Sequence, residues 1–217
     1  MSLAIKPVIF LAFANDRSGH QPYLEALKKE RIEIQAKLQP AVDAGLCEVV
    51  IEPDATPEDV FRVFNLYPNR IAIFHYAGHG SNDGLHLTTE DSILNKLANI
   101  TGLAQLFGTQ SKLELIFLNA CCTNGQTDEI KQQTKANVIT TLSSIRDDVA
   151  FNFATQFYEC IGQKATLEDA YKTAEAFIKT GTSVAAPEDD EAGKLWNIGM
   201  KKSKRPKRFP WKIEGKT

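Results

Sequence analysis

The sequence has few cysteines and no long apolar run. Only four of its 217 residues are cysteine, and two of these, Cys121 and Cys122, are adjacent. Four thiols with this spacing do not indicate a disulfide scaffold, and they favour a reducing compartment. No apolar stretch approaches the length of a membrane span, and the first residues, MSLAIKP, lack the layout of a signal peptide. We therefore expect a cytoplasmic protein without membrane contact.

A strong net charge is also missing, because 25 basic and 27 acidic residues give −2. The exception is the end of the chain, where nine of the residues 194–217 are Lys or Arg and one is acidic. Such a run can contact nucleic acid or an acidic partner, but it is more often a solvated, solubilising tail. Nothing else in the sequence is typical of a nucleic-acid module, so we do not expect nucleic acid as a partner.

Phosphate-binding and metal-binding motifs are absent as well. The segment ANDRSGHQ after the first apolar run has a single glycine, which argues against a nucleotide-binding, flavodoxin-like domain. A metal site made of His75, His79 and His86 is conceivable, but these residues are not a structural-zinc ligand set. We expect neither a metal nor a cofactor.

Five short apolar runs alternate with helical patterns along the chain. The runs occupy residues 7–13, 46–52, 70–76, 113–119 and 137–143. The helical patterns occupy residues 23–42, 56–67, 147–162 and 166–181. This alternation predicts an α/β fold, a three-layer αβα sandwich with a mostly parallel sheet of about six strands.

The length favours one domain over residues 1–217 rather than two. Within it, residues 182–208 have the composition of a charged loop or linker. Residues 209–214 could then supply a closing strand.

Two of the predicted strands end in residues suited to nucleophilic chemistry. His79 stands between Gly78 and Gly80 after the third run, and Cys121 follows the fourth run in LIFLNACCTNG. Open parallel sheets carry their chemistry at the carboxyl ends of strands, so neighbouring strands would bring the imidazole to the thiol. An imidazole can take the thiol proton and deliver it to a leaving amine, while the Gly80 amide is free to act as an oxyanion donor.

The motifs HYAGHG and FLNACCT resemble those of the CHAT domains, which are caspase-like proteases related to caspases, metacaspases, separases and gingipains. The resemblance extends from the first strand to about Thr180 and implies a caspase-like fold. It implies a cysteine endopeptidase with His79 as base and acid and Cys121 as nucleophile. The backbone amides of Gly80 and Cys121 would form the oxyanion hole. Cleavage of protein partners in a bacterial defence or regulated-death system is the role it suggests.

Cys122 departs from the family pattern, which usually has a polar residue there. Strand alternation points adjacent side chains in opposite directions, and the Ala-Cys register favours Cys121, so Cys122 would be a buried or resolving thiol. His75 is expected to be structural, packed beneath the site. Cys47 and Cys160 are expected in the core.

Asp147 and Asp148 are the candidates for binding the residue before the cut. They follow the fifth run, where an acidic pocket would select Arg or Lys by charge pairing. They are equally well explained as first-turn acids that stabilise a helix. Asn119, which is neutral where basic-specific relatives often have an acid, weakens the idea of a basic-specific pocket.

Two further expectations concern activity and its control. Only 14 residues, 122–135, separate Cys121 from the next predicted strand, and one short helix would use most of them. We therefore expect activation by a protein partner or a neighbouring domain rather than by cleavage there. The alternative function is a caspase-like binding or scaffold module without catalytic turnover, because fold alone does not decide function.

Overall fold

A computed structural model describes residues 5–16, 21–89, 96–181 and 196–199. Its central feature is a six-stranded sheet with the strand order β2–β1–β3–β7–β8–β9. The strands are β1 (Val8–Ala14), β2 (Glu48–Glu52), β3 (Ile71–Gly78), β7 (Leu115–Asn119), β8 (Asn137–Thr141) and β9 (Trp196–Gly199). The first five pair in parallel and β9 pairs antiparallel with β8. Each predicted apolar run therefore forms a strand.

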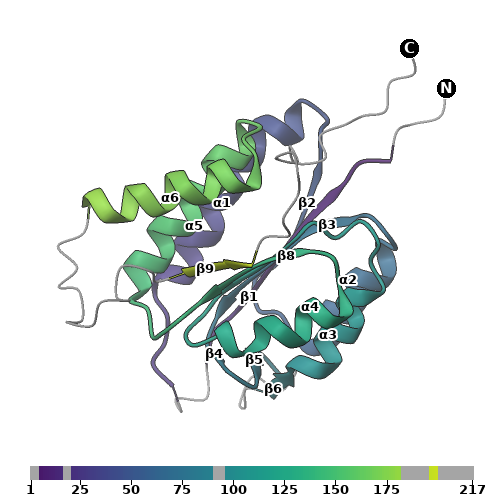
Figure 1. The fold of residues 1–217 in the computed structure, drawn as a ribbon. Helices are drawn as coiled ribbons and strands as arrows, with labels where there is room; N and C mark the ends of the chain where they lie inside the picture. The colour runs from purple at the N-terminus through teal and green to yellow at the C-terminus, as the bar shows by residue number, and fades with distance from the viewer. Residues whose placement is uncertain (1–4, 17–20, 90–95, 182–195, 200–217) are drawn as a thin grey trace.

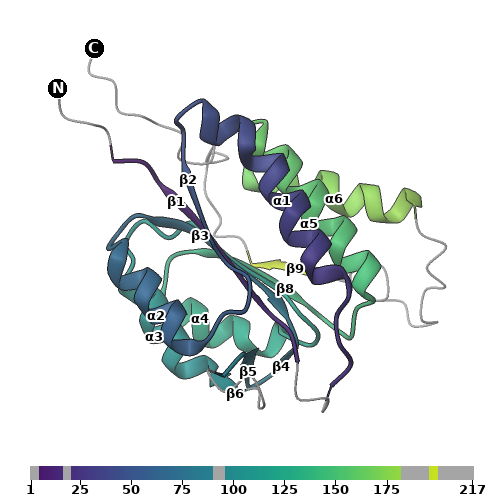
Figure 2. The same cartoon turned by 180° about the vertical axis from the view of Figure 1, so that it is seen from behind.

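Helices cover both faces of this sheet (Figures 1 and 2). One face carries α1 (Ala26–Asp43), α5 (Asp147–Gly162) and α6 (Leu167–Gly181), and the other carries α2 (Pro57–Leu66), α3 (Ile100–Gly108) and α4 (Thr127–Gln133). Each face has its own cluster of buried apolar side chains. The predicted three-layer αβα sandwich is thus confirmed.

Local sequence explains the boundaries of these elements. Every residue of β1, β3 and β7 is buried, because helices lie on both faces of the sheet, and this produces their unbroken apolar runs. Helix α2 begins at a capping box in which the Thr56 hydroxyl accepts from the amide of Asp59, and Pro57 occupies the first helical position. Helix α5 begins with two acids, as favoured by the helix dipole.

A second, small sheet was not predicted from the sequence. It consists of the antiparallel strands β4 (Gly80–Ser81), β5 (Gly84–Leu87) and β6 (Lys96–Asn99), which directly follow His79. Strands of two to four residues carry too little alternation to be recognised in a sequence. The hairpin matters for function because it fixes the path of the chain beyond His79.

The C-terminal part differs from expectation where it is described. Strand β9 lies inside the segment 182–208, which was expected to be a loop or linker, and it adds the antiparallel edge strand. The possible closing strand at 209–214 lies outside the described residues, and the single domain over residues 1–217 stays a prediction. In the described part of the chain, no helix combines the length and apolar character needed to cross a membrane.

Candidate active site

Strands β3 and β7 are neighbours, and their carboxyl ends lie at the same edge of the sheet. Ala77 of β3 pairs with Asn119 of β7 in a parallel register. His79 follows the end of β3 and Cys121 follows the end of β7, each separated from its strand by a single small residue or none. The topology therefore delivers an imidazole and a thiol to one edge, as the alternating pattern of the sequence led us to expect.

Gly80 is the point at which the two loops touch. A Cβ atom at this position would lie 2.9 Å from Cβ of Ala120 and 3.0 Å from Cγ2 of Thr123. Such separations are closer than van der Waals contact allows, so only glycine lets the chain after His79 pass this close to the Cys121 turn.

Buried polar contacts hold the β4–β5 hairpin in this position. Nε2 of Gln126, a fully buried side chain just after the Cys121 turn, donates to the carbonyl oxygens of Ser81 at 2.6 Å and Gly84 at 3.1 Å. The hydroxyl of Tyr76 donates to the carbonyl oxygens of His79 at 2.8 Å and His86 at 2.7 Å. The loops after His79 and Cys121 are thus docked on each other.

Cys121 and Cys122 lie beyond the last residue of β7, so strand alternation does not separate their side chains. The chain turns here, with a φ of +55° at Cys122. Sγ of Cys121 accepts from the amide of Ile145 at 3.4 Å, while Sγ of Cys122 lies 3.9 Å from Oγ of Ser144. The turn, rather than the pleat, directs the two thiols to different places. Cys122 is partly exposed instead of buried.

The imidazole of His79 is held by a backbone carbonyl. Its Nε2 lies 2.8 Å from the carbonyl oxygen of Pro22. A carbonyl oxygen can only accept, so Nε2 must carry a hydrogen and donate it. In the neutral ring the unprotonated, basic nitrogen is therefore Nδ1. Because Pro22 acts through its main chain, no side-chain pattern in the sequence identified it.

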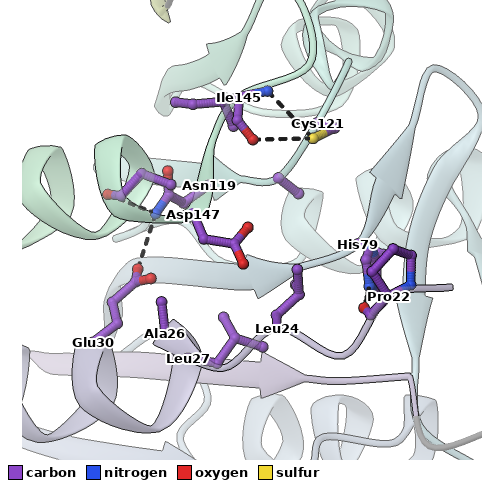
Figure 3. A pocket seen from close by; sticks show the side chains of 13 residues that line it. Pro22, Leu24, Ala26, Leu27, Glu30, His79, Asn119, Cys121, Ile145 and Asp147 are labelled. Carbon is purple, nitrogen blue, oxygen red and sulfur yellow. Dashed lines mark hydrogen bonds between the residues drawn. The ribbon is translucent and has the colours of Figure 1, made fainter. Parts of the chain in front are cut away.

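His79 and Cys121 line one cavity of about 200 Å³. Figure 3 shows both residues with the segment before α1, helix α5 and the turn after β8 around them. Among the described residues, no hydrogen bond joins the imidazole to the thiol. The cavity has walls of apolar side chains and its polar groups are few. Its lining residues are Pro22, Leu24, Ala26, Leu27, Glu30, Gly78, His79, Asn119, Ala120, Cys121, Ile145, Asp147 and Ala150.

The two predicted oxyanion donors lie where the loops meet. Gly80 pairs with Leu85 in the β4–β5 hairpin, and the amide of His86 donates to the carbonyl of His79. Hydrogen-bonded and non-hydrogen-bonded pairs alternate in an antiparallel ladder, so the Gly80 amide points away from β5. The amide of Cys121 has no acceptor among the described residues. Both amides are thus available to an added oxygen atom.

The two candidate substrate-binding acids, Asp147 and Asp148, occupy different environments in the structure. Asp147 lines the cavity, whereas Asp148 binds the guanidinium of Arg146 at 2.6 Å on the exposed surface. Partial burial raises the pKa of the Asp147 carboxyl; Glu30 and Asp148 add to this, and His79 opposes it. Both acids also occupy the first turn of α5, as the helix-stabilising alternative expects.

A buried carboxylate that was not predicted lies at the cavity. Glu30 of α1 is 2% exposed, and its Oε1 accepts from Nδ2 of Asn119 at 2.9 Å. Glu30 shares the buried face of its helix with Leu27, Ile34 and Leu38. A charged residue at a core-facing position of a helical pattern was the signal that could have revealed it.

His75, Cys47 and Cys160 lie in or against the hydrophobic core. His75 is fully buried among aromatic rings, with centroid distances of 4.8 Å to Phe117 and 5.4 Å to Tyr158, and its expected burial is confirmed. Cys47 is buried, which raises the pKa of its thiol to about 11, and Cys160 packs against the core while partly exposed. Across the described ranges, no three His, Cys, Asp or Glu side chains are grouped as metal ligands would be.

Comparison with models of protein families shows which family this chain belongs to. The CHAT domain model matches residues 3–189. The chain belongs to the CHAT domain family. The match covers the five parallel strands of the central sheet, but not the antiparallel strand β9, and it includes His79 and Cys121. No curated protein matches the sequence of this CHAT domain.

Solved structures share the fold of the CHAT domain. The Arg-specific cysteine proteinase gingipain R aligns with a TM-score of 0.55 and 13% identity, over 82% of this chain and 43% of the gingipain chain. A secreted C11 cysteine protease from Bacteroides thetaiotaomicron, solved with an irreversible peptide inhibitor, aligns with a TM-score of 0.53 and 12% identity, over 86% of this chain and 63% of its own. The CHAT domain thus has a caspase-like fold and spans less than two thirds of either protein.

Proposed function

We propose that this CHAT domain is a cysteine endopeptidase with Cys121 as nucleophile and His79 as the group that moves the proton. The observation that carries the proposal is the hydrogen bond from Nε2 of His79 to the carbonyl of Pro22, at 2.8 Å. It leaves Nδ1 as the basic nitrogen of an imidazole that lines the same cavity as the thiol.

The reaction follows from these two groups. Nδ1 of His79 takes the proton of the Cys121 thiol, and the resulting thiolate attacks the carbonyl carbon of the peptide bond. The protonated ring then gives its proton to the leaving amine, which leaves a thioester on Cys121. Attack of water, deprotonated by His79, breaks the thioester and restores the thiol. Pro22 stabilises the imidazolium because its carbonyl accepts from Nε2 in both protonation states.

The negative charge that develops on the substrate oxygen needs donors. The amides of Gly80 and Cys121 would supply them, and removing one such donor from a hydrolase typically costs about 10²- to 10³-fold in rate. The close packing of Gly80 against the Cys121 turn supports this role, because it fixes the distance between the two amides.

The biological setting rests on the sequence motifs and not on the fold. We propose that the substrates are proteins of a bacterial defence or regulated-death system and that the enzyme acts in the cytoplasm. A protein partner or neighbouring domain would activate it. The lack of a hydrogen bond between His79 and Cys121 among the described residues supports such a resting state, which a partner could convert by a small shift of either loop.

Mass spectrometry of new protein N-termini tests the activity. A lysate supplemented with candidate neighbouring proteins is incubated with the wild-type chain, Cys121→Ala or Cys122→Ala. We expect new termini with wild type and Cys122→Ala and none with Cys121→Ala. The same set of new termini with all three proteins would favour the scaffold module instead.

A further inference from the structure

The cavity beside Cys121 contains a buried acid at its side away from the thiol. In Figure 3, Glu30 lies on one side of the cavity and Cys121 and His79 lie on the other, with the Asp147 carboxylate between them. Glu30 is 2% exposed, and its Oε1 accepts from Nδ2 of Asn119. Asn119 also donates to the carbonyl of Ala150 at 3.2 Å, so the amide holds the Glu30 carboxylate in place.

The Glu30 carboxylate has no strong cationic partner. In the part of the chain that the structure describes, no Lys or Arg forms an ion pair with it, and no donor is in hydrogen-bonding range of its Oε2. Nε2 of His75 lies 3.5 Å from Oε1 without a hydrogen bond. Nearby cations have other contacts: Lys29 lies over the Phe151 ring at 4.7 Å and Arg146 binds Asp148. Burying a carboxylate costs free energy unless a cation pairs with it. A substrate cation that pairs with Glu30 would therefore bind favourably here.

The rest of the lining fits a cation on a long apolar stem. Leu24, Leu27 and Ile145 form walls that can cover methylene groups, and neither Lys nor Arg is among the lining residues. Asp147 adds a second carboxylate nearer the surface. A side chain that enters past the thiol therefore passes apolar walls and the Asp147 carboxylate, and it meets the Glu30 carboxylate at its far end.

We propose that Glu30 determines specificity, and that the cavity binds the Lys or Arg side chain of the residue whose carbonyl Cys121 attacks. This inference rests on the proposed peptidase function. The position follows from the lining: Cys121 and His79 border the cavity, so a substrate with its carbonyl carbon at Sγ directs the adjacent side chain into it. Helix α1 supplies the acid, and Asn119 of β7, 89 positions away in the sequence, holds it in place.

Reactive peptides test the pocket without requiring turnover. Three peptidyl chloromethyl ketones differ only in the last residue, which is arginine, citrulline or norleucine. Citrulline keeps the size of arginine and lacks its charge. The rate of labelling of Cys121 is followed by intact mass and peptide mapping. For wild type we expect arginine to react about 100-fold faster than citrulline, because citrulline leaves the buried carboxylate without a charged partner.

The variant Glu30→Gln removes the charge and keeps an oxygen to accept from Asn119. We expect it to slow the arginine reagent at least about 30-fold, which corresponds to about 2 kcal/mol, and to change the citrulline reagent less than about threefold. Glu33→Gln, on the same helix and outside the cavity lining, is the matched control and should behave as wild type. Urea unfolding of each variant verifies that the fold is retained.

The possible outcomes distinguish a failure of the proposed role of Glu30 from a failure of the proposed peptidase function. Equal rates with arginine and citrulline in wild type, or an equal loss of both in Glu30→Gln, would overturn the role of Glu30 in specificity. If Cys121 reacts rapidly with iodoacetamide but with none of the ketones, the pocket assignment is wrong and the thiol–imidazole proposal stands. If Cys121 is no more reactive toward iodoacetamide than a free cysteine, the proposed function itself fails.

Discussion

The carbonyl oxygen of Pro22 lies 2.8 Å from Nε2 of His79, and this contact determines which nitrogen of the ring can act as a base. Pro22 lies in the segment before α1, which also lines the cavity with Leu24. Asn15, just after β1, holds this segment, since its Nδ2 donates to the Leu24 carbonyl at 3.0 Å and its Oδ1 accepts from the Leu24 amide at 2.9 Å. The orientation of His79 thus depends on the end of β1 as well as on β3.

Gly80→Ala should impair the site more than the fold. The added Cβ would lie 2.9 Å from Cβ of Ala120, so the two loops must move apart. We expect a loss of about 1–3 kcal/mol in the free energy of unfolding, as in overpacked cores, with a fall of more than about tenfold in Cys121 reactivity or turnover.

Gly102→Ala is the control for this substitution. Gly102 lies in α3, where a Cβ meets nothing within 4 Å, and alanine should stabilise the helix by about 0.5–1 kcal/mol. Urea unfolding and thiol labelling are measured on both variants. Wild-type reactivity in Gly80→Ala would mean that the close approach of the loops is not needed.

Gln126→Ala should loosen the β4–β5 hairpin from the Cys121 turn. The variant leaves the carbonyls of Ser81 and Gly84 without their donor in a buried site, at a cost of about 1–3 kcal/mol each in the worst case. Hydrogen exchange should become faster in the hairpin and remain unchanged in β1. Gln132→Ala, at an exposed position of α4, should change neither quantity. Unchanged exchange at residues 80–87 in Gln126→Ala would contradict the anchoring role.

The helix dipole favours an acid at Asp147, but the raised pKa of its carboxyl indicates that burial outweighs the dipole, so its charge should lower the stability of the fold at neutral pH. Partial burial raises the pKa of its carboxyl above the value in the unfolded chain, so the free energy of unfolding falls as the pH rises through these two values. Asp147→Asn should therefore raise the free energy of unfolding at pH 7 and match wild type at pH 3, where the carboxyl is protonated in both states.

Asp148→Asn is the matched control, because Asp148 is the exposed partner of Arg146. Losing a surface ion pair lowers the free energy of unfolding at pH 7 by about 0–1 kcal/mol. Urea denaturation at the two pH values measures both variants. A lower stability of Asp147→Asn than of wild type at pH 7 would show that the carboxylate is stabilised in the fold rather than penalised.

Cleavage between Cys122 and Lys135 should not activate the chain. Residues 124–126 form a 3₁₀ helix and residues 127–133 form α4, so ten of the connecting residues are helical. A cut there would divide the connection between the adjacent strands β7 and β8. Incubation at high concentration should leave the intact mass unchanged, and activity should depend on an added partner. Active protein recovered only as two fragments cut in this segment would refute this prediction.

The central strands β1, β3 and β7 could be predicted because they are buried on both faces, which gives them unbroken apolar runs in the sequence. The short hairpin after His79 could not, because two-residue strands such as Gly80–Ser81 leave no periodic signal. Parallel pairing of β3 and β7 then made the proximity of His79 and Cys121 foreseeable.

Contacts between segments that are distant in the sequence could not be predicted from it. The Pro22 carbonyl is a main-chain group with no side-chain signature. The Glu30 carboxylate reaches Asn119 across the packing of α1 on the sheet, which only the tertiary structure fixes. The assignment of Cys121 over Cys122 to the cavity was anticipated for a different reason, since a turn with positive φ, and not strand alternation, directs their thiols.

The rate of iodoacetamide alkylation at each cysteine, measured by peptide mapping from pH 5 to 9, tests the central claim most directly. If His79 activates Cys121, Cys121 should react first at neutral pH, ahead of Cys122 and far ahead of the buried Cys47. His79→Ala should slow Cys121 at least about tenfold at pH 7 and leave Cys122 unchanged. Faster alkylation of Cys122, or a Cys121 rate that does not change in His79→Ala, would contradict the assignment of the dyad.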